Sequence, residues 1–138
     1  AAFFRIAMPP ESVANPDIDL DIYVYDPLGG LVASSTSGGT DELVDILLPQ
    51  DGTWSVYVHG WQTAGSSADY DMYSWVISAT PGGNLFIDSA PASATLGAIE
   101  TINVSWTGAT AGQWHLGAVS HTGDVGLVGL TLVDVNNR

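Results

Sequence analysis

The chain has 138 residues, the size of one ordinary domain or two small ones, and 46% of them are hydrophobic, which is enough for a buried core. Fifteen acidic residues against Arg5 and Arg138 give a formal charge of −13, which repels phosphates and argues against nucleic-acid and anionic membrane partners. Cysteine is absent, which excludes disulfides and thiolate metal sites, and no apolar run reaches the roughly 18 to 20 residues that span a bilayer.

Short alternating segments bounded by Gly, Pro, Asn and Ser recur along the whole chain, whereas helical periodicity is nearly absent. These segments predict strands at residues 3–8, 20–25, 31–35, 42–48, 53–59, 70–79, 85–89, 101–107, 113–120 and 126–135. No segment offers the helical crossover that a parallel sheet needs. We therefore expect an all-β fold, an antiparallel β-sandwich or a jelly-roll-like arrangement.

The segment SATPGGN divides the chain into two parts. Residues 1–80 are expected to form a β-sandwich, and residues 81–138 to form a smaller β lobe or the completing strands of the same sandwich. Within these parts we expect two inward-facing sets on alternating strands: Trp54, Val56 and Val58 in the first part, and Ile102, Val104 and Trp106 in the second.

Aspartates at every second position open the stretch DIDLDIYVYD, residues 17–26. Alternation places Ile18, Leu20, Ile22 and Val24 on one face of a strand and Asp19, Asp21, Tyr23 and Tyr25 on the other. Closely spaced carboxylates can provide the oxygen ligands that calcium prefers. The predicted calcium site consists of Asp17, Asp19 and Asp21, joined by Asp41 and Glu42 from the neighbouring segment TDELVD, in which Asp45 is an alternative ligand. The other interpretation is a solvated acidic strand end.

Aromatic residues suggest a second site, for ligands. Trp61 is close in sequence to Tyr73 and Trp75, which point to the same side of a predicted strand and could stack on sugar rings or grip a peptide. The alternative is that these rings pack on the core and on a neighbouring domain.

No catalytic residues are predicted. His59, His115 and His121 are the only histidines, and none of them lies in a recognisable nucleophile or metalloprotease motif. Gly-rich phosphate loops and dinucleotide fingerprints are also missing from the sequence.

Four segments occur in a characteristic order: DLDIYVYDPLGGLVASS at 19–35, GTWSVYVHGW at 52–61, YSWVISATPGGNL at 73–85 and GQWHLGAVSHTG at 112–123. Together they resemble the C-terminal accessory region of secreted bacterial subtilisin-like serine proteases, which is similar to the bacterial pre-peptidase C-terminal domains, a group of β-sandwiches. The resemblance implies a secreted, extracellular location and a non-catalytic role. The implied partners are the catalytic domain of the parent protease or neighbouring β domains.

The sequence therefore predicts a non-catalytic accessory domain that stabilises or positions a parent protease, with calcium as its expected cofactor. The alternative is a targeting module that holds insoluble protein or polysaccharide through surface aromatics. A third interpretation is a maturation element removed after secretion. The start without Met is compatible with it and suggests a piece of a longer precursor.

Overall fold

The computed structural model describes residues 1–138 and contains ten β-strands and one short 3-10 helix, Pro10–Ser12. Every strand pair is antiparallel, which confirms the predicted all-β class. The chain divides into two compact units, Ala1–Ala79 and Thr80–Arg138, at the Pro81-Gly82-Gly83 segment singled out in the sequence. None of the chain's helical structure has the length and apolar character needed to cross a membrane.

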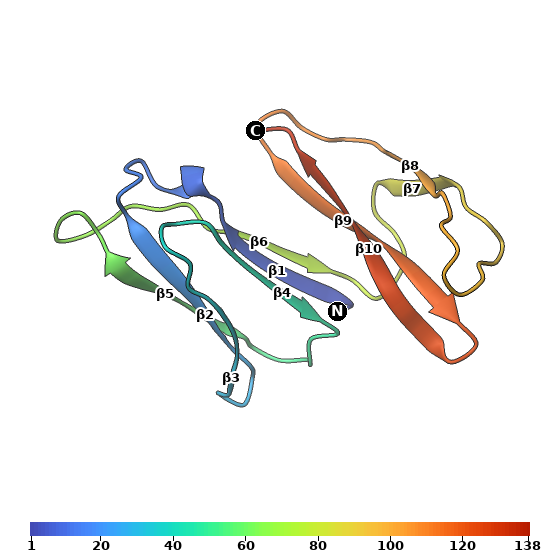
Figure 1. Ribbon diagram of the computed structural model, residues 1–138, viewed down its shortest axis with the longest axis horizontal. Coiled ribbons are helices and arrows are strands. Elements are labelled where there is room, and N and C mark those ends of the chain that lie inside the picture. Colours follow the sequence, from blue (N-terminus) through green and yellow to red (C-terminus); the bar gives the residue numbers. More distant parts are fainter. The chain divides into compact units, whose positions relative to one another are not determined.

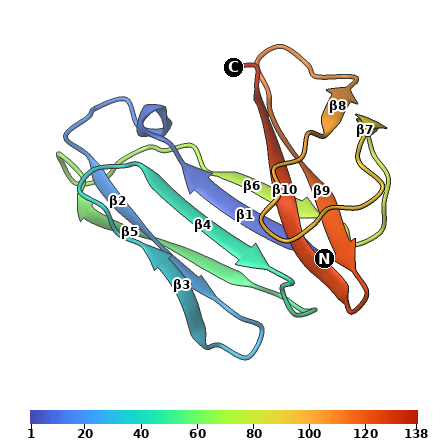
Figure 2. The same ribbon diagram turned by 45° about the vertical axis from the view of Figure 1, so that its right-hand side comes forward.

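Two three-stranded sheets make up the first unit (Figures 1 and 2). One sheet has the order β4-β1-β6 and the other has the order β3-β2-β5. The strands are β1 (Phe3–Met8), β2 (Asp19–Tyr25), β3 (Leu31–Ser35), β4 (Glu42–Leu47), β5 (Ser55–Gln62) and β6 (Tyr73–Ile77).

The core of the first unit draws side chains from both sheets. Alternate residues of β1 and β2 join this core because every second side chain of a strand points to the same face, and β1 is buried along its whole length. The buried cluster consists of Phe4, Ile6, Met8, Val13, Ile18, Leu20, Ile22, Val24 and Val44. Trp54, Val56 and Val58 of the predicted inward set pack against it, as expected. The first unit is thus a small β-sandwich whose hydrophobic core lies between the two sheets.

A turn that requires glycine precedes β5. Gly52 has a φ of +135°, a conformation that residues with a Cβ rarely adopt, and a Cβ there would lie 2.7 Å from Pro27 Cβ. Gly52 ends the segment PQDG, whose Pro, Asp and Gly are residues typical of turns, so this glycine meets a backbone requirement of the turn.

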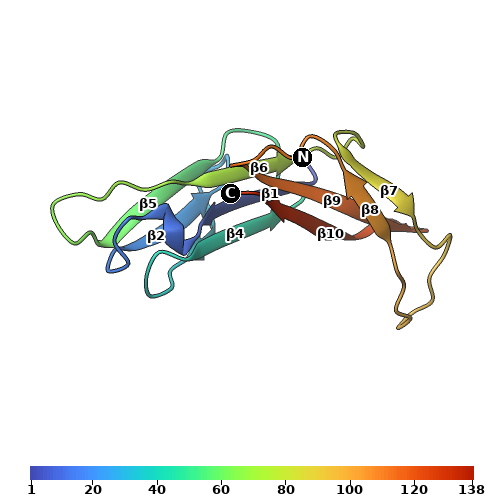
Figure 3. The same ribbon diagram turned by 90° about the horizontal axis from the view of Figure 1, so that it is seen from above.

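The second unit consists of two antiparallel strand pairs. The long hairpin of β9 (Trp114–Gly123) and β10 (Gly126–Asn136) is drawn in orange and red in Figure 3, and β7 (Leu85–Ser89) pairs with β8 (Asn103–Trp106). A Cβ at Gly117 of β9 would lie 2.8 Å from Leu85 Cδ2, so β7 approaches β9 closely at this glycine. The expectation for Trp106 was wrong: its side chain is 46% exposed.

All ten predicted strands are present, and the main deviations lie at the ends of two of them. The predicted strand 70–79 is shortened to β6, Tyr73–Ile77. In the register of the β1–β6 pair, Tyr70 and Asp71 would lie opposite Pro10 and Pro9, which lack the N–H groups that would continue the ladder, and the backbone N–H of Asp71 donates instead to the Ser12 carbonyl at 2.9 Å. The predicted strand 53–59 is displaced to Ser55–Gln62.

Truncation of a buried β2 side chain tests this core. Ile22 is 0% exposed, so Ile22→Ala removes packed methyl groups and leaves a cavity between the sheets. We expect a loss of about 2 to 5 kcal/mol in the free energy of unfolding, measured by urea titration. The matched control Leu28→Ala, at a side chain that is 88% exposed, is expected to change stability by no more than about 0.5 kcal/mol. Equal effects of the two substitutions would contradict the assignment of the core.

Candidate functional site

The acidic residues at the start of β2 lie in three different environments. Asp17 is exposed in the turn before the strand, where its backbone N–H donates to Asn15 Oδ1 at 3.0 Å. Asp19 and Asp21 belong to the alternating set opposite the core residues Leu20 and Ile22. Asp21 is buried, and its Oδ2 accepts a hydrogen bond from His59 Nδ1 at 3.1 Å.

Glu42 is the most deeply buried acidic residue, with only 1% of its surface exposed. It opens β4 on the same face as the core residue Val44. Its Oε1 accepts hydrogen bonds from the backbone N–H of Ser37 at 2.8 Å and from Ser37 Oγ at 2.7 Å. The neighbouring Asp41 is exposed, and its backbone carbonyl accepts from Ser37 Oγ at 3.2 Å.

The five residues predicted to bind calcium are therefore divided between different faces. Glu42 shares the face of the core residues of β4, whereas Asp19 and Asp21 are on the face of β2 opposite the core. No group of three or more His, Asp or Glu side chains is arranged to hold a metal ion. Calcium binding stays a prediction.

Three buried side-chain oxygens have no hydrogen-bond partner: Ser12 Oγ, Asp19 Oδ1 and Glu42 Oε2. They belong to segments that meet at one end of the sandwich, because Glu42 lies opposite Met8, the last residue of β1, and Thr40 Oγ1 donates to the carbonyl of Ile18, just before β2, at 3.0 Å. A buried oxygen without a partner costs about 1 to 3 kcal/mol, and more when it is charged. A hydrogen-bond donor or a cation at this end of the unit would therefore stabilise these oxygens.

The residues predicted for ligand binding do not form one site. Tyr73 and Trp75 of β6 stack with their ring centroids 6.1 Å apart and an interplanar angle of 17°, and both are half-buried. They are paired in register with Ala7 and Arg5 of β1. Trp61 belongs to β5 in the other sheet and is 73% exposed. The structure therefore brings Tyr73 and Trp75 together and leaves Trp61 apart.

Trp61 instead belongs to a row of rings on β2 and β5, which we call the aromatic face: Tyr23, Tyr25, Tyr57, His59 and Trp61. Ring centroids lie 5.3 Å apart for Tyr25 and Tyr57, 6.3 Å for Tyr23 and His59, and 6.2 Å for His59 and Trp61. Strand pairing explains the row, since Tyr23 is opposite Tyr57 and Asp21 is opposite His59. The alternating YVY of β2 and YVHGW of β5 are the sequence signal for this face. Only the structure shows that these two strands pair.

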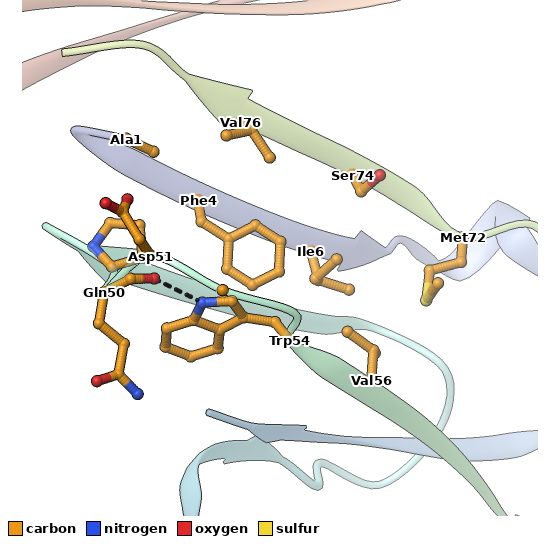
Figure 4. Close-up of a pocket in the computed structure, with 12 residues that line it drawn as sticks. Ala1, Phe4, Ile6, Gln50, Asp51, Trp54, Val56, Met72, Ser74 and Val76 are labelled. Carbon is orange, nitrogen blue, oxygen red and sulfur yellow. Dashed lines mark hydrogen bonds between the residues drawn. The ribbon is translucent and has the colours of Figure 1, made fainter. Parts of the chain in front are cut away.

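A pocket of about 440 Å³ lies at the side of the sandwich formed by β1, β6 and β5 (Figure 4). Its apolar lining includes Phe4, Ile6, Trp54, Val56, Met72 and Val76. Trp54 Nε1 donates a hydrogen bond to the Gln50 carbonyl at 3.0 Å, which holds the indole at the pocket (Figure 4). No sequence motif indicated this pocket.

Each histidine has a structural partner. His59 pairs with Asp21, His121 Nε2 lies 2.8 Å from Thr131 Oγ1, and His115 Nε2 accepts a hydrogen bond from the backbone N–H of Thr110 at 3.3 Å. All three interactions join neighbouring strands or a strand and its adjoining loop. Contacts within the fold therefore explain the positions of the three histidine side chains.

Part of the first unit matches a known protein family. Residues 8–60 match the family described as the bacterial pre-peptidase C-terminal domain. The chain is also 31% identical over 99 residues to pyrolysin of Pyrococcus furiosus, an alignment that covers 67% of the chain and 7% of pyrolysin. The chain thus spans a small fraction of that relative. No solved structure matches it.

These findings confirm the resemblance seen in the sequence. Pre-peptidase C-terminal domains are non-catalytic accessory domains associated with the C-terminal regions of secreted proteases. The match begins at the last residue of β1 and ends within β5, so it includes the acidic strand β2 and most of the aromatic face. Over residues 8–60 the chain is therefore similar to the bacterial pre-peptidase C-terminal domain.

Proposed function

We propose that this chain is an accessory module of a secreted subtilisin-like serine protease and that it stabilises or positions the parent enzyme outside the cell. The observation that carries the proposal is the family match at residues 8–60, together with the similarity to pyrolysin. The fold supports it, since the first unit has a core of its own and its one histidine, His59, is held by Asp21 of the neighbouring strand β2.

Calcium is the proposed cofactor of the stabilising role. Calcium takes six to eight oxygen ligands, more than any one cluster of acidic side chains supplies here. What supports calcium is that two buried carboxylate oxygens have no partner, Glu42 Oε2 on the core face of β4 and Asp19 Oδ1 on the outer face of β2. An ion bound only by the folded form would stabilise it by about 2.7 kcal/mol at a free concentration a hundredfold above Kd.

A thermal melt of the chain in calcium and in chelator measures this stabilisation. Because about 1 kcal/mol shifts the midpoint of a small domain by roughly 4 to 8 °C, we expect the midpoint in saturating calcium to be roughly 10 to 20 °C higher than in chelator. Glu42→Gln and Asp19→Asn are expected to reduce the difference between the two melts. Asp124→Asn, at an exposed hairpin residue, should leave that difference unchanged. Superimposable wild-type curves in calcium and chelator would remove the ion from the proposal.

A second candidate function is targeting of insoluble protein or polysaccharide. The 73% exposure of Trp61 favours it, because a large ring left in solvent in a row of other rings is typical of a contact surface. The candidate differs from the stabilising role in the residues it needs, since it depends on the surface of β2 and β5 and not on the core.

Pull-down of the chain on collagen, chitin and cellulose tests targeting. We expect retention to fall in Trp61→Ala and to persist in Trp75→Ala, since Trp75 is half-buried in the other sheet. Trp61→Ala should change the free energy of unfolding by no more than about 0.5 kcal/mol, because the removed side chain is exposed. Absence of retention on all three matrices would leave the stabilising role as the function.

A further inference from the structure

The aromatic face combines exposure with an uneven surface. Tyr57 is 60% exposed and Trp61 is 73% exposed, and the His59 side chain between them is 54% exposed. Neighbouring rings are inclined by 79° for Tyr25 and Tyr57, 74° for Tyr23 and His59, and 68° for His59 and Trp61. Rings at such angles offer several separate π faces and edges instead of one flat platform.

Carboxylates continue the aromatic face along β2. Asp19 and Asp21 are on the same side of the strand as Tyr23 and Tyr25, since their positions alternate with those of the core residues. Asp21 forms the hydrogen bond to His59, and Asp19 Oδ1 is buried without a partner. Negative charge therefore lies directly beside the exposed rings.

Little positive charge is available within the chain to balance these carboxylates. The sequence contains two Lys or Arg residues against fifteen acidic ones. Arg5 is 9% exposed and forms two 2.7 Å hydrogen bonds to Asp45, in which Nε donates to Oδ1 and Nη2 to Oδ2. The field of the chain attracts cations, and it does so in the neighbourhood of rings that can bind them.

We propose that the aromatic face binds an extended, positively charged polypeptide segment. Its Lys or Arg side chains lie over the rings of Tyr57 and Trp61, where cation–π attraction adds to the attraction of the β2 carboxylates. A neutral sugar chain is disfavoured because it would gain nothing from the charge and would meet rings inclined to one another. The inference deepens the targeting candidate: it names the chemistry of the protein that would be held.

The test measures binding of fluorescein-labelled peptides by anisotropy with the whole chain. Three probes of twelve residues alternate Pro with Arg, Gln or Glu, so that they share an extended backbone and differ in charge. We expect the Pro-Arg probe to bind and the other two to bind at least tenfold more weakly. Because an exposed cation–π contact is worth about 0.5 to 1 kcal/mol, Tyr57→Ala and Trp61→Ala should each weaken Pro-Arg binding about two- to fivefold.

Tyr70→Ala is the matched control, because Tyr70 is a 44% exposed tyrosine outside the aromatic face, and it should leave the affinity unchanged. Thermal melts of the three variants confirm that each is folded. Pro-Arg binding that is equal in wild type and in both ring variants would be non-specific attraction to an acidic protein and would overturn the inference. Retention on a matrix through Trp61 with no preference among the three probes would overturn the inference and leave targeting intact. If no matrix retains the chain and no probe is preferred, both the targeting candidate and this inference are contradicted.

Discussion

The alternation of side chains along β2 is the constraint on which the first unit depends. Leu20, Ile22 and Val24 are almost completely buried and hold the two sheets together. The residues between them, Asp19, Asp21, Tyr23 and Tyr25, are directed to the opposite face by the same geometry. A slip of one residue in the pairing of β2 with β5 would place carboxylates in the core, so the pattern fixes the register.

This constraint links the stability of the unit to its surface chemistry. The pairing that aligns Ile22 with Val58 also aligns Asp21 with His59 and Tyr23 with Tyr57. Between Asp19 and Leu20 the register shifts, and Trp61 is the additional residue of β5 at this bulge. Bulges redirect side chains and end regular pairing, and here the bulge lies where the aromatic face meets the acidic end of β2. The pairing of β2 with β5 thus determines the positions of the core residues, the carboxylates and the rings.

The existence and order of the strands could be predicted from the sequence because hydrophobic alternation and turn residues are local signals. The ends of strands were harder to predict. The start of β6, for example, is set by two prolines that follow its partner strand about sixty residues earlier in the chain. The site depended on which strands become neighbours. Sequence proximity grouped Trp61 with Tyr73 and Trp75, yet they lie in different sheets, and the proximity of Asp41 to Glu42 concealed that one is exposed and the other buried.

The chain contains no cysteine, so single introduced thiols can report which residues of β2 are covered. Tyr23→Cys and Val24→Cys place a thiol on neighbouring residues of β2, and the rate of reaction with a water-soluble thiol reagent reports how each is covered. We expect a fast reaction at position 23 and one slower by at least about a factor of ten at position 24, which is fully buried in the core. Equal rates in two folded variants would contradict the division of β2 into a core face and an outer face.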